Sequence, residues 1–285
     1  MTTRAVPVLM LAAAAIAAAA PQRIISLAPN TTEILYGVGA FSQVVAVSQF
    51  CNYPPAVAKL PRVGGFETSD IEKIIALRPD LVLFIKAQEP FILDKLEAFS
   101  IRSMAVPSES LVDIYTAMQM IGKATGHEKQ ADDLVQQTRA SLDRIRSATV
   151  NLPRRNVLLC VNRTPGTLAD LYVATPGSYL IDLINIAGGQ SGVERSRTGY
   201  IKLSKEAILS LNPDVIIDLI HNAQSRFSGH STEAWNDIPE LRAVREKHIY
   251  PLTDESVVHP SQLVVHTAQT FVRILHPEAA AGIEH

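Results

Sequence analysis

The sequence contains few of the residues that mark several common protein classes. Only two cysteines, Cys51 and Cys160, occur in 285 residues, and a disulfide-stapled scaffold needs more of them in a much shorter chain. We therefore expect two free thiols, Cys160 in a buried strand and Cys51 in a loop. The formal net charge is -2, whereas a nucleic-acid-binding surface normally shows a strong basic excess. No nucleic-acid partner is predicted.

Sequence signatures of common enzymes are also missing. The chain has no G-x-S-x-G, H-E-x-x-H or G-x-x-x-x-G-K-[ST] motif, and no G-x-G-x-x-G follows the first predicted strand. The eight histidines are scattered, with no i, i+4 pair suited to zinc. Catalytic groups can still converge from distant positions. We expect a protein that is not an enzyme and has no cofactor or resident metal, with a secreted α/β enzyme acting on a metal chelate as the alternative.

The first twenty residues differ from the rest. Arg4 precedes an apolar run from 6 to 19, and Ala18, Ala19 and Ala20 offer small-residue cleavage sites. The run is shorter than the roughly 20 residues that span a bilayer. We expect 1–20 to be a cleaved secretory signal, the mature protein to be periplasmic, and no other segment to cross a membrane.

One stretch of the chain occurs twice. Residues 72–84 read EKIIALRPDLVLF, and residues 206–218 read EAILSLNPDVIID. Each copy starts with helix-like apolar spacing and then reaches a proline, which disfavours helix in the residue before it. An apolar run follows, as in a strand buried on both faces of a parallel sheet. The repeat predicts two similar α/β lobes, with the function located where they face each other.

Residues 127–148 lie in the longest segment without glycine or proline, which runs between Gly126 and Pro153. These 22 residues would span about 33 Å as a helix. We interpret them as a rigid connector between the lobes; the alternative is a further surface helix of one large domain. The expected divisions are 1–20 (signal), 21–126 (first lobe), 127–149 (connecting helix), 150–277 (second lobe) and 278–285 (a frayed tail). The apolar side of the connector comprises Ala131, Leu134, Val135, Leu142 and Ile145.

Two further expectations concern the start of the chain's first helix and the starts of the repeated helices. Thr31 or Thr32 is expected to cap the helix that ends near Gly37. Ser69 or Asp70 is expected to cap the first repeated helix, because both precede its apolar pattern.

Aromatic residues occupy matching places before the two repeats. Phe66 stands six residues before Glu72, and Tyr200 stands six before Glu206, each in a predicted loop. If the lobes face each other, both rings line a cleft, and Phe50 and Tyr53 would extend its wall. Aromatic faces bury a large area against a flat, partly apolar ligand. The alternative is that these rings belong to the ordinary core.

Glu72 and Glu206 also have two interpretations. An acid in the first helical turn is favoured by the helix dipole, by about 0.3–1 kcal/mol. Alternatively, one glutamate on each lobe forms a pair of docking charges for a two-fold partner. The residues alone leave both open.

The chain resembles the periplasmic substrate-binding proteins of ABC importers for cobalamin, haem and iron–siderophores, over essentially all of 22–276. The resemblance implies an α/β fold of two Rossmann-like lobes with parallel central sheets, joined by one long rigid helix, with a ligand cleft between them. It also implies that Glu72 and Glu206 dock onto the two subunits of an inner-membrane permease, and that the protein is a monomer. The matching segments are 23–33, 52–55, 63–66, 72–83 and 206–217.

Within this family, the Asn-Tyr-Pro-Pro turn at 52–55 is most similar to the cobalamin-binding branch. That branch has tryptophans where Phe66 and Tyr200 stand here. The haem-binding branch has a tyrosine where this chain has Gly65. Siderophore binders carry several cleft arginines, and Arg195, Arg197 and Arg226 are the candidates for that role.

The expected function is capture of a corrinoid, with a ferric siderophore or haem as the alternative ligand. Pro29 and Asn30, which follow the first strand, complete the expected ligand-binding set together with His259. His259 precedes the last helix, from where it could reach the cleft and coordinate a metal centre; a lone loop histidine is otherwise a surface residue.

Overall fold

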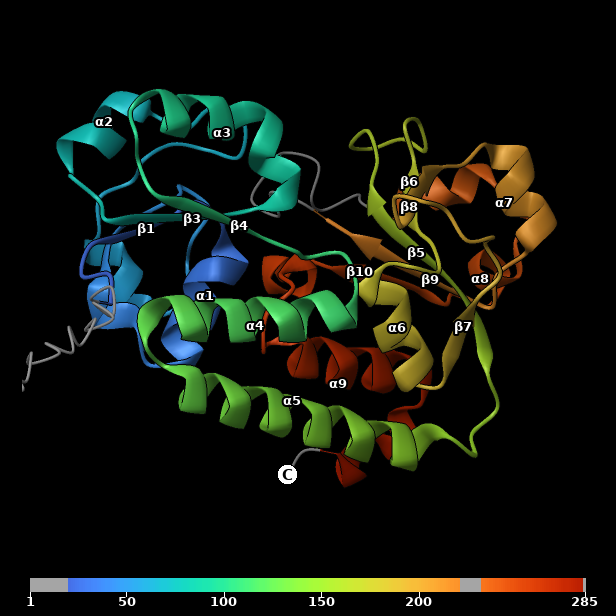
Figure 1. Cartoon of the computed structure of the whole chain (residues 1–285). Coiled ribbons are helices and arrows are strands. Elements are labelled where there is room, and N and C mark those ends of the chain that lie inside the picture. The colour runs from blue at the N-terminus through green and yellow to red at the C-terminus, as the bar shows by residue number, and fades with distance from the viewer. Residues whose placement is uncertain (1–19, 221–231, 284–285) are drawn as a thin grey trace, which may run out of the picture.

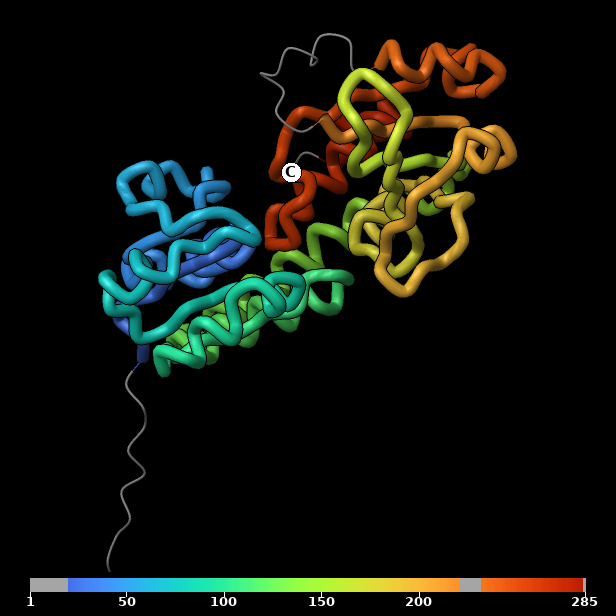
Figure 2. Tube along the Cα trace, turned by 90° about the horizontal axis from the view of Figure 1, so that it is seen from above, coloured from blue at the N-terminus to red at the C-terminus, as the bar shows by residue number. Residues whose placement is uncertain are grey.

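The computed structural model describes residues 20–220 and 232–283. Two β-sheets organise these residues, and helices cover them (Figure 1). Seen from above, the blue-to-cyan part and the yellow-to-red part form two bodies, and the green helices run along both (Figure 2). We call these bodies the first and second lobes. The predicted two-lobe α/β fold is confirmed.

The first lobe contains a four-stranded sheet in which every neighbouring pair of strands is parallel, in the order β2-β1-β3-β4. Helices cover both faces of this sheet. The side chains of its strands are therefore mostly apolar on both faces. The strands are β1 (Ile24–Ser26), β2 (Val44–Val47), β3 (Leu81–Ile85) and β4 (Ser103–Val106). The helices are α1 (Pro29–Gly37), α2 (Ile71–Ala76), α3 (Glu89–Ala98) and α4 (Leu111–Thr125).

The second lobe has a six-stranded mixed sheet. Its parallel part is β10-β9-β5 with β7, and β6 and β8 extend it as antiparallel strands. The strands are β5 (Arg155–Asn162), β6 (Tyr172–Ala174), β7 (Gly189–Ser191), β8 (Tyr200–Lys202), β9 (Val215–Leu219) and β10 (Ile249–Leu252). The helices are α6 (Tyr179–Ile186), α7 (Lys205–Leu211), α8 (Arg242–Arg245) and α9 (Val264–Leu275).

The sequence repeat forms the same unit in both lobes. Helices α2 and α7 lead into the central strands β3 and β9 through a left-handed residue before the proline, Arg78 with φ 47° and Asn212 with φ 39°. Each helix is capped by a side chain, Asp70 in α2 and Ser204 in α7. The expected cap at Asp70 is confirmed.

The aspartate after each proline fastens the repeat to the first strand of its own lobe. Asp80 accepts hydrogen bonds from the backbone N–H groups of Gln22 and Arg23, at 2.7 and 2.9 Å. Asp214 accepts one from the N–H of Asn156 at 2.9 Å. These bonds satisfy donors at the strand entry, which gives the repeated aspartate a structural role in both lobes.

Helix α5 (Glu128–Thr149) runs along both lobes (Figure 1). It packs on α1 and α4 of the first lobe and on α6 and α9 of the second. Four residues of the predicted apolar side are buried, and Leu134 is half-buried. The helix therefore contributes to one core that continues from lobe to lobe.

Two expectations about the ends of elements are wrong. Helix α1 begins at Pro29 with Ala28 as its N-cap, because proline suits the first helical position. Thr31 and Thr32 instead lie inside the helix and donate to the carbonyl of Ala28. The described part of the tail, up to Ile283, is not frayed, since a 3-10 helix continues it over Pro277–Gly282 and Ile283 is buried in the core.

The predicted signal segment lies outside the described residues except for Ala20, so its cleavage stays a prediction. Within the described ranges, no helix combines the length and apolar character needed to cross a bilayer.

Candidate functional site

Aromatic side chains are exposed on the first lobe at the predicted positions. Phe66, in the loop before α2, is 38% exposed. Phe50 and Tyr53, in the loop after β2, are exposed as well. Tyr53 packs edge-on against Tyr36 with ring centroids 5.5 Å apart, and Phe66 lies 6.1 Å from Phe91. Aromatic residues of the core are buried, so exposure separates these rings from the core. A group of exposed rings suits a ligand-binding surface.

Buried polar contacts hold the loop that carries Phe50. The Sγ atom of Cys51 lies 3.2 Å from the hydroxyls of both Thr32 and Ser48. Arg62 donates to the carbonyl oxygens of Ser48 and Cys51 at 2.9 and 2.5 Å. Because Cys51 and its contacts fix the backbone, Phe50 is held outward.

Gly64 and Gly65 bring the Phe66 loop close to its neighbours. Gly64 has φ 104°, and a Cβ there would lie 2.3 Å from the carbonyl oxygen of Thr68. A Cβ on Gly65 would lie 3.4 Å from Cε2 of Phe50. It would also lie 3.0 Å from Nε2 of Gln49, so a side chain at 65 would press on Gln49 while meeting the Phe50 ring at contact distance.

The second lobe has its own aromatic cavity, of about 380 Å³. Tyr200 lines it from β8, so the expectation that Tyr200 lies in a loop is wrong: antiparallel pairing with β6 draws it into the sheet. Tyr172 of β6 is an exposed partner that was not among the predicted site residues, because it lies outside the repeat that singled out the other rings. The cavity is lined by Val161, Asn162, Tyr172, Leu180, Tyr200 and Val258.

Tyr200 is more enclosed than its repeat counterpart Phe66. It is half-buried and hydrogen-bonds to Ser178, and burial raises the pKa of its phenol. At neutral pH the cavity therefore presents a neutral hydroxyl beside apolar walls.

Pro29 and Asn30 form the first turn of α1, at the carboxyl end of β1. Asn30 is buried, and its Nδ2 atom has no hydrogen-bond partner in the described residues. Of the predicted arginines, Arg195 and Arg197 are exposed between β7 and β8. Arg226 lies outside the described residues.

His259 is not a surface residue, as a lone loop histidine would be. Its Nδ1 atom lies 2.7 Å from Oε1 of Glu33, whose side chain is 1% exposed. Ser261 donates to Oε2 of Glu33 at 2.5 Å, and Gln262 donates to its backbone carbonyl at 2.7 Å. These bonds join α1 of the first lobe to the loop before α9. Glu33 and His259 are 226 residues apart in the sequence, so no local pattern links them. Glu33 was not among the predicted site residues.

A second contact joins the lobes at the start of α4. The backbone N–H of Tyr179 donates to the carbonyl of Glu109 at 2.7 Å. The carboxylate of Asp182 accepts from the backbone N–H of Leu111, although burial raises the pKa of Asp182 overall. Tyr200 is electrostatically coupled to Glu109, which sets the second-lobe cavity beside this contact.

Glu72 and Glu206 are exposed in the first turns of α2 and α7. Neither forms an ion pair with a described residue. Their neighbouring lysines have other partners: Lys73 is 3.3 Å from Asp70, and Lys205 is 3.2 Å from Asp237. Both acids are therefore available to an outside partner.

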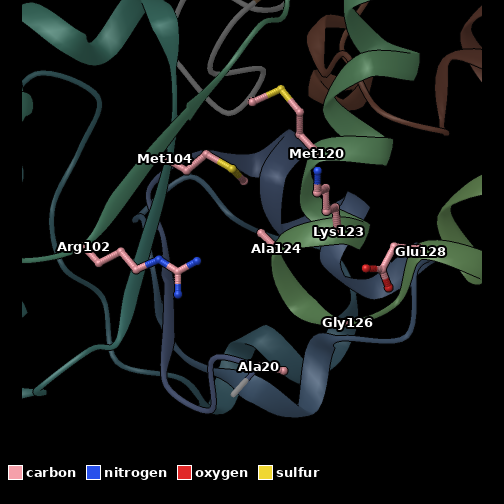
Figure 3. A pocket seen from close by; sticks show the side chains of 8 residues that line it. All are labelled: Ala20, Arg102, Met104, Met120, Lys123, Ala124, Gly126 and Glu128. Carbon is pink, nitrogen blue, oxygen red and sulfur yellow. The ribbon is translucent and has the colours of Figure 1, made fainter. Parts of the chain in front are cut away.

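A larger cavity, of about 490 Å³, lies between β4 and the start of α5. Figure 3 shows Arg102 and Met104 on one wall, with Met120 and Lys123 on the other. It contains none of the predicted site residues. Among the described residues, no cluster of three or more His, Cys, Asp or Glu side chains is arranged to hold a metal ion.

Comparison with known proteins identifies the family. Residues 24–256 match the profile of the periplasmic binding proteins. The chain belongs to this family. It is thus a substrate-binding transport protein and not an enzyme, as predicted.

The similar proteins include both sequence relatives and a solved structure. An uncharacterized ABC transporter substrate-binding lipoprotein of Bacillus subtilis, YvrC, is 26% identical over 90% of this chain and 81% of its own. The vitamin B12-binding protein of Vibrio vulnificus is 26% identical, with 89% of each chain covered. The periplasmic vitamin B12 binding protein BtuF of Vibrio cholerae superposes with a TM-score of 0.75 at 25% identity, covering 92% and 98%.

Proposed function

We propose that the chain captures a corrinoid in the cleft between its lobes and delivers it to an ABC importer in the inner membrane. The observation that carries the ligand choice is the exposure of aromatic rings on both lobes: Phe50, Tyr53 and Phe66 on one, Tyr172 on the other, with Tyr200 beside it. The B12-binding relatives support the same choice.

The physical argument is burial of apolar area. A corrinoid is a large macrocycle whose ring and methyl groups offer apolar area between its amide side chains, and an aromatic residue can bury 150–250 Å². At roughly 25 cal/mol per Å², several rings would outweigh the cost of ordering their loops.

The connections between the lobes suit a small hinge movement. Helix α5 packs on both lobes, and the Glu33–His259 and Glu109–Tyr179 contacts bridge them. Large closure would break these buried contacts. Ligand binding would therefore order the aromatic loops more than it closes the lobes.

Calorimetry tests the ligand. Purified mature protein should bind cobalamin at one site, with a heat signal that haem and a ferric siderophore do not give. A signal with either of those and none with cobalamin would overturn the choice. The visible spectrum of protein purified from its native host provides an independent check, because corrinoids, haem and ferric chelates absorb differently.

A further inference from the structure

The ring of His259 is held in one orientation by Glu33. An ionised carboxylate only accepts hydrogen bonds, and Glu33 is almost fully buried with Ser261 donating to one oxygen and His259 facing the other. A buried carboxylate is stable only when such donors surround it. The proton of a neutral His259 ring therefore resides on Nδ1, where it donates to Glu33.

This arrangement leaves the lone pair on Nε2. That atom has no hydrogen-bond partner in the described residues, and it is not among their fully enclosed polar atoms. The side chain retains 11% exposure. A neutral imidazole whose second nitrogen is oriented by a carboxylate is the form that metal-binding histidines take.

The residues that precede His259 lie at the second-lobe cavity. Val258, the preceding residue, lines the Tyr200 cavity. Val257, one residue earlier, lies near the hydroxyl of Tyr179, at 3.5 Å. Burial, together with the nearby Tyr200 and Glu33, raises the pKa of the Tyr179 phenol, so the acid that holds His259 lies near the cavity residue Tyr200.

Resting on the proposed function, we propose that His259 is an axial ligand for the metal at the centre of the bound macrocycle. A metal in a tetrapyrrole already has four ring nitrogens, so one protein nitrogen is sufficient. The Nε2 lone pair would form the new bond, the axial water would leave, and the oxidation state would not change. The substrate class is a metallotetrapyrrole with an exchangeable axial position, such as an aquocorrinoid or ferric haem; a coordinatively saturated siderophore complex does not qualify.

The test compares ligands with and without an exchangeable axial site. Aquocobalamin and ferric haem are the first kind, and cyanocobalamin and metal-free protoporphyrin are the second. The unmodified protein should shift the visible bands of aquocobalamin; a shift with ferric haem alone would overturn the corrinoid as cargo but not the ligation. His259→Asn retains a donor toward Glu33 without the coordinating nitrogen. It should abolish the shift and lower affinity for that ligand at least about tenfold, while the second kind binds unchanged.

Two further variants complete the design. Glu33→Gln should lower affinity for the exchangeable ligand on the order of tenfold, as loss of an orienting partner does, and His266→Ala, an exposed histidine of α9, should change nothing. Circular dichroism establishes that each variant is folded. If His259→Asn leaves the shift intact, ligation is wrong and the proposed function stands. If no macrocycle binds the unmodified protein, the proposed function fails and the ligation with it.

Discussion

Phe66 and Tyr200 occupy the same repeat position but have different surroundings. Phe66 is exposed and contacts Phe91, and only its backbone carbonyl is held, by Gln88. Tyr200 is fixed in β8 and bonded to Ser178. An exposed ring and a half-buried ring would contribute differently to a ligand, because the exposed side chain has more conformational freedom to lose when it binds.

Truncation of either ring tests the aromatic cleft. Phe66→Ala and Tyr200→Ala should each weaken cobalamin binding on the order of tenfold, because each removes apolar area from the ligand surface. Isothermal calorimetry measures the dissociation constants. Phe99→Ala, another exposed aromatic, is the control and should leave affinity unchanged. If both test variants bind cobalamin with the dissociation constant of the unmodified protein, the two rings have only a structural role.

The two cysteines are both buried and free, as expected. Burial raises the pKa of the Cys51 and Cys160 thiols. The reactive thiolate is therefore scarce at neutral pH. We expect a thiol reagent such as Ellman's to label neither cysteine in the native protein at pH 7.5 and both in denaturant. Rapid labelling of one thiol in the folded protein would contradict this.

At the scale of elements, the repeated aspartate is the most testable feature. Asp80→Ala leaves the N–H groups of Gln22 and Arg23 without their partner, and should lower the free energy of unfolding by about 1–2 kcal/mol. Urea denaturation should show a lower midpoint at an unchanged slope. Asp94→Ala, at an exposed position of α3, is the matched control. Equal midpoints for the two variants would exclude the fastening role.

The elements that the sequence predicted are those with strong local patterns. The repeat predicted α2, β3, α7 and β9, and the apolar side of α5 predicted the connector. Burial imposes a period on the apolar residues of such elements. Strand β8 was missed because three residues that depend on pairing with β6 carry little pattern of their own. Glu33 and His259 were not linked, because folding alone brings them together. The aromatic positions were predictable only through the repeat.

At the scale of the whole molecule, Glu72 and Glu206, which we propose as docking acids, lie on different lobes. Helices α2 and α7, which carry them, are on the side of the molecule away from α5 (Figure 1). One rigid connection between the lobes would hold the two carboxylates at a nearly constant separation. A partner with two equivalent subunits could then meet both at once, and simultaneous engagement strengthens binding more than either contact alone.

Charge reversal distinguishes docking from ligand capture. Glu72→Lys combined with Glu206→Lys should abolish cobalamin uptake in cells while calorimetric affinity for cobalamin stays unchanged, because both residues are exposed on α2 and α7 and neither lines the aromatic cavity. Each single reversal should reduce uptake by a smaller factor, since one contact remains. Glu97→Lys, an exposed acid of α3, is the control for charge alone.

The dependence of uptake on pH gives a second readout of the same surface. Ser204 holds the pKa of Glu206 below its ordinary value, so this carboxylate stays ionised as the medium is acidified toward the usual pKa of glutamate. Because the pKa of Glu206 is lowered, its negative charge is lost only at a pH below the usual pKa of glutamate. Docking through Glu206 should therefore persist at a pH where an ordinary glutamate is already being protonated. Ser204→Ala should move the loss of uptake to higher pH. Uptake that survives the double reversal would refute docking through these two acids.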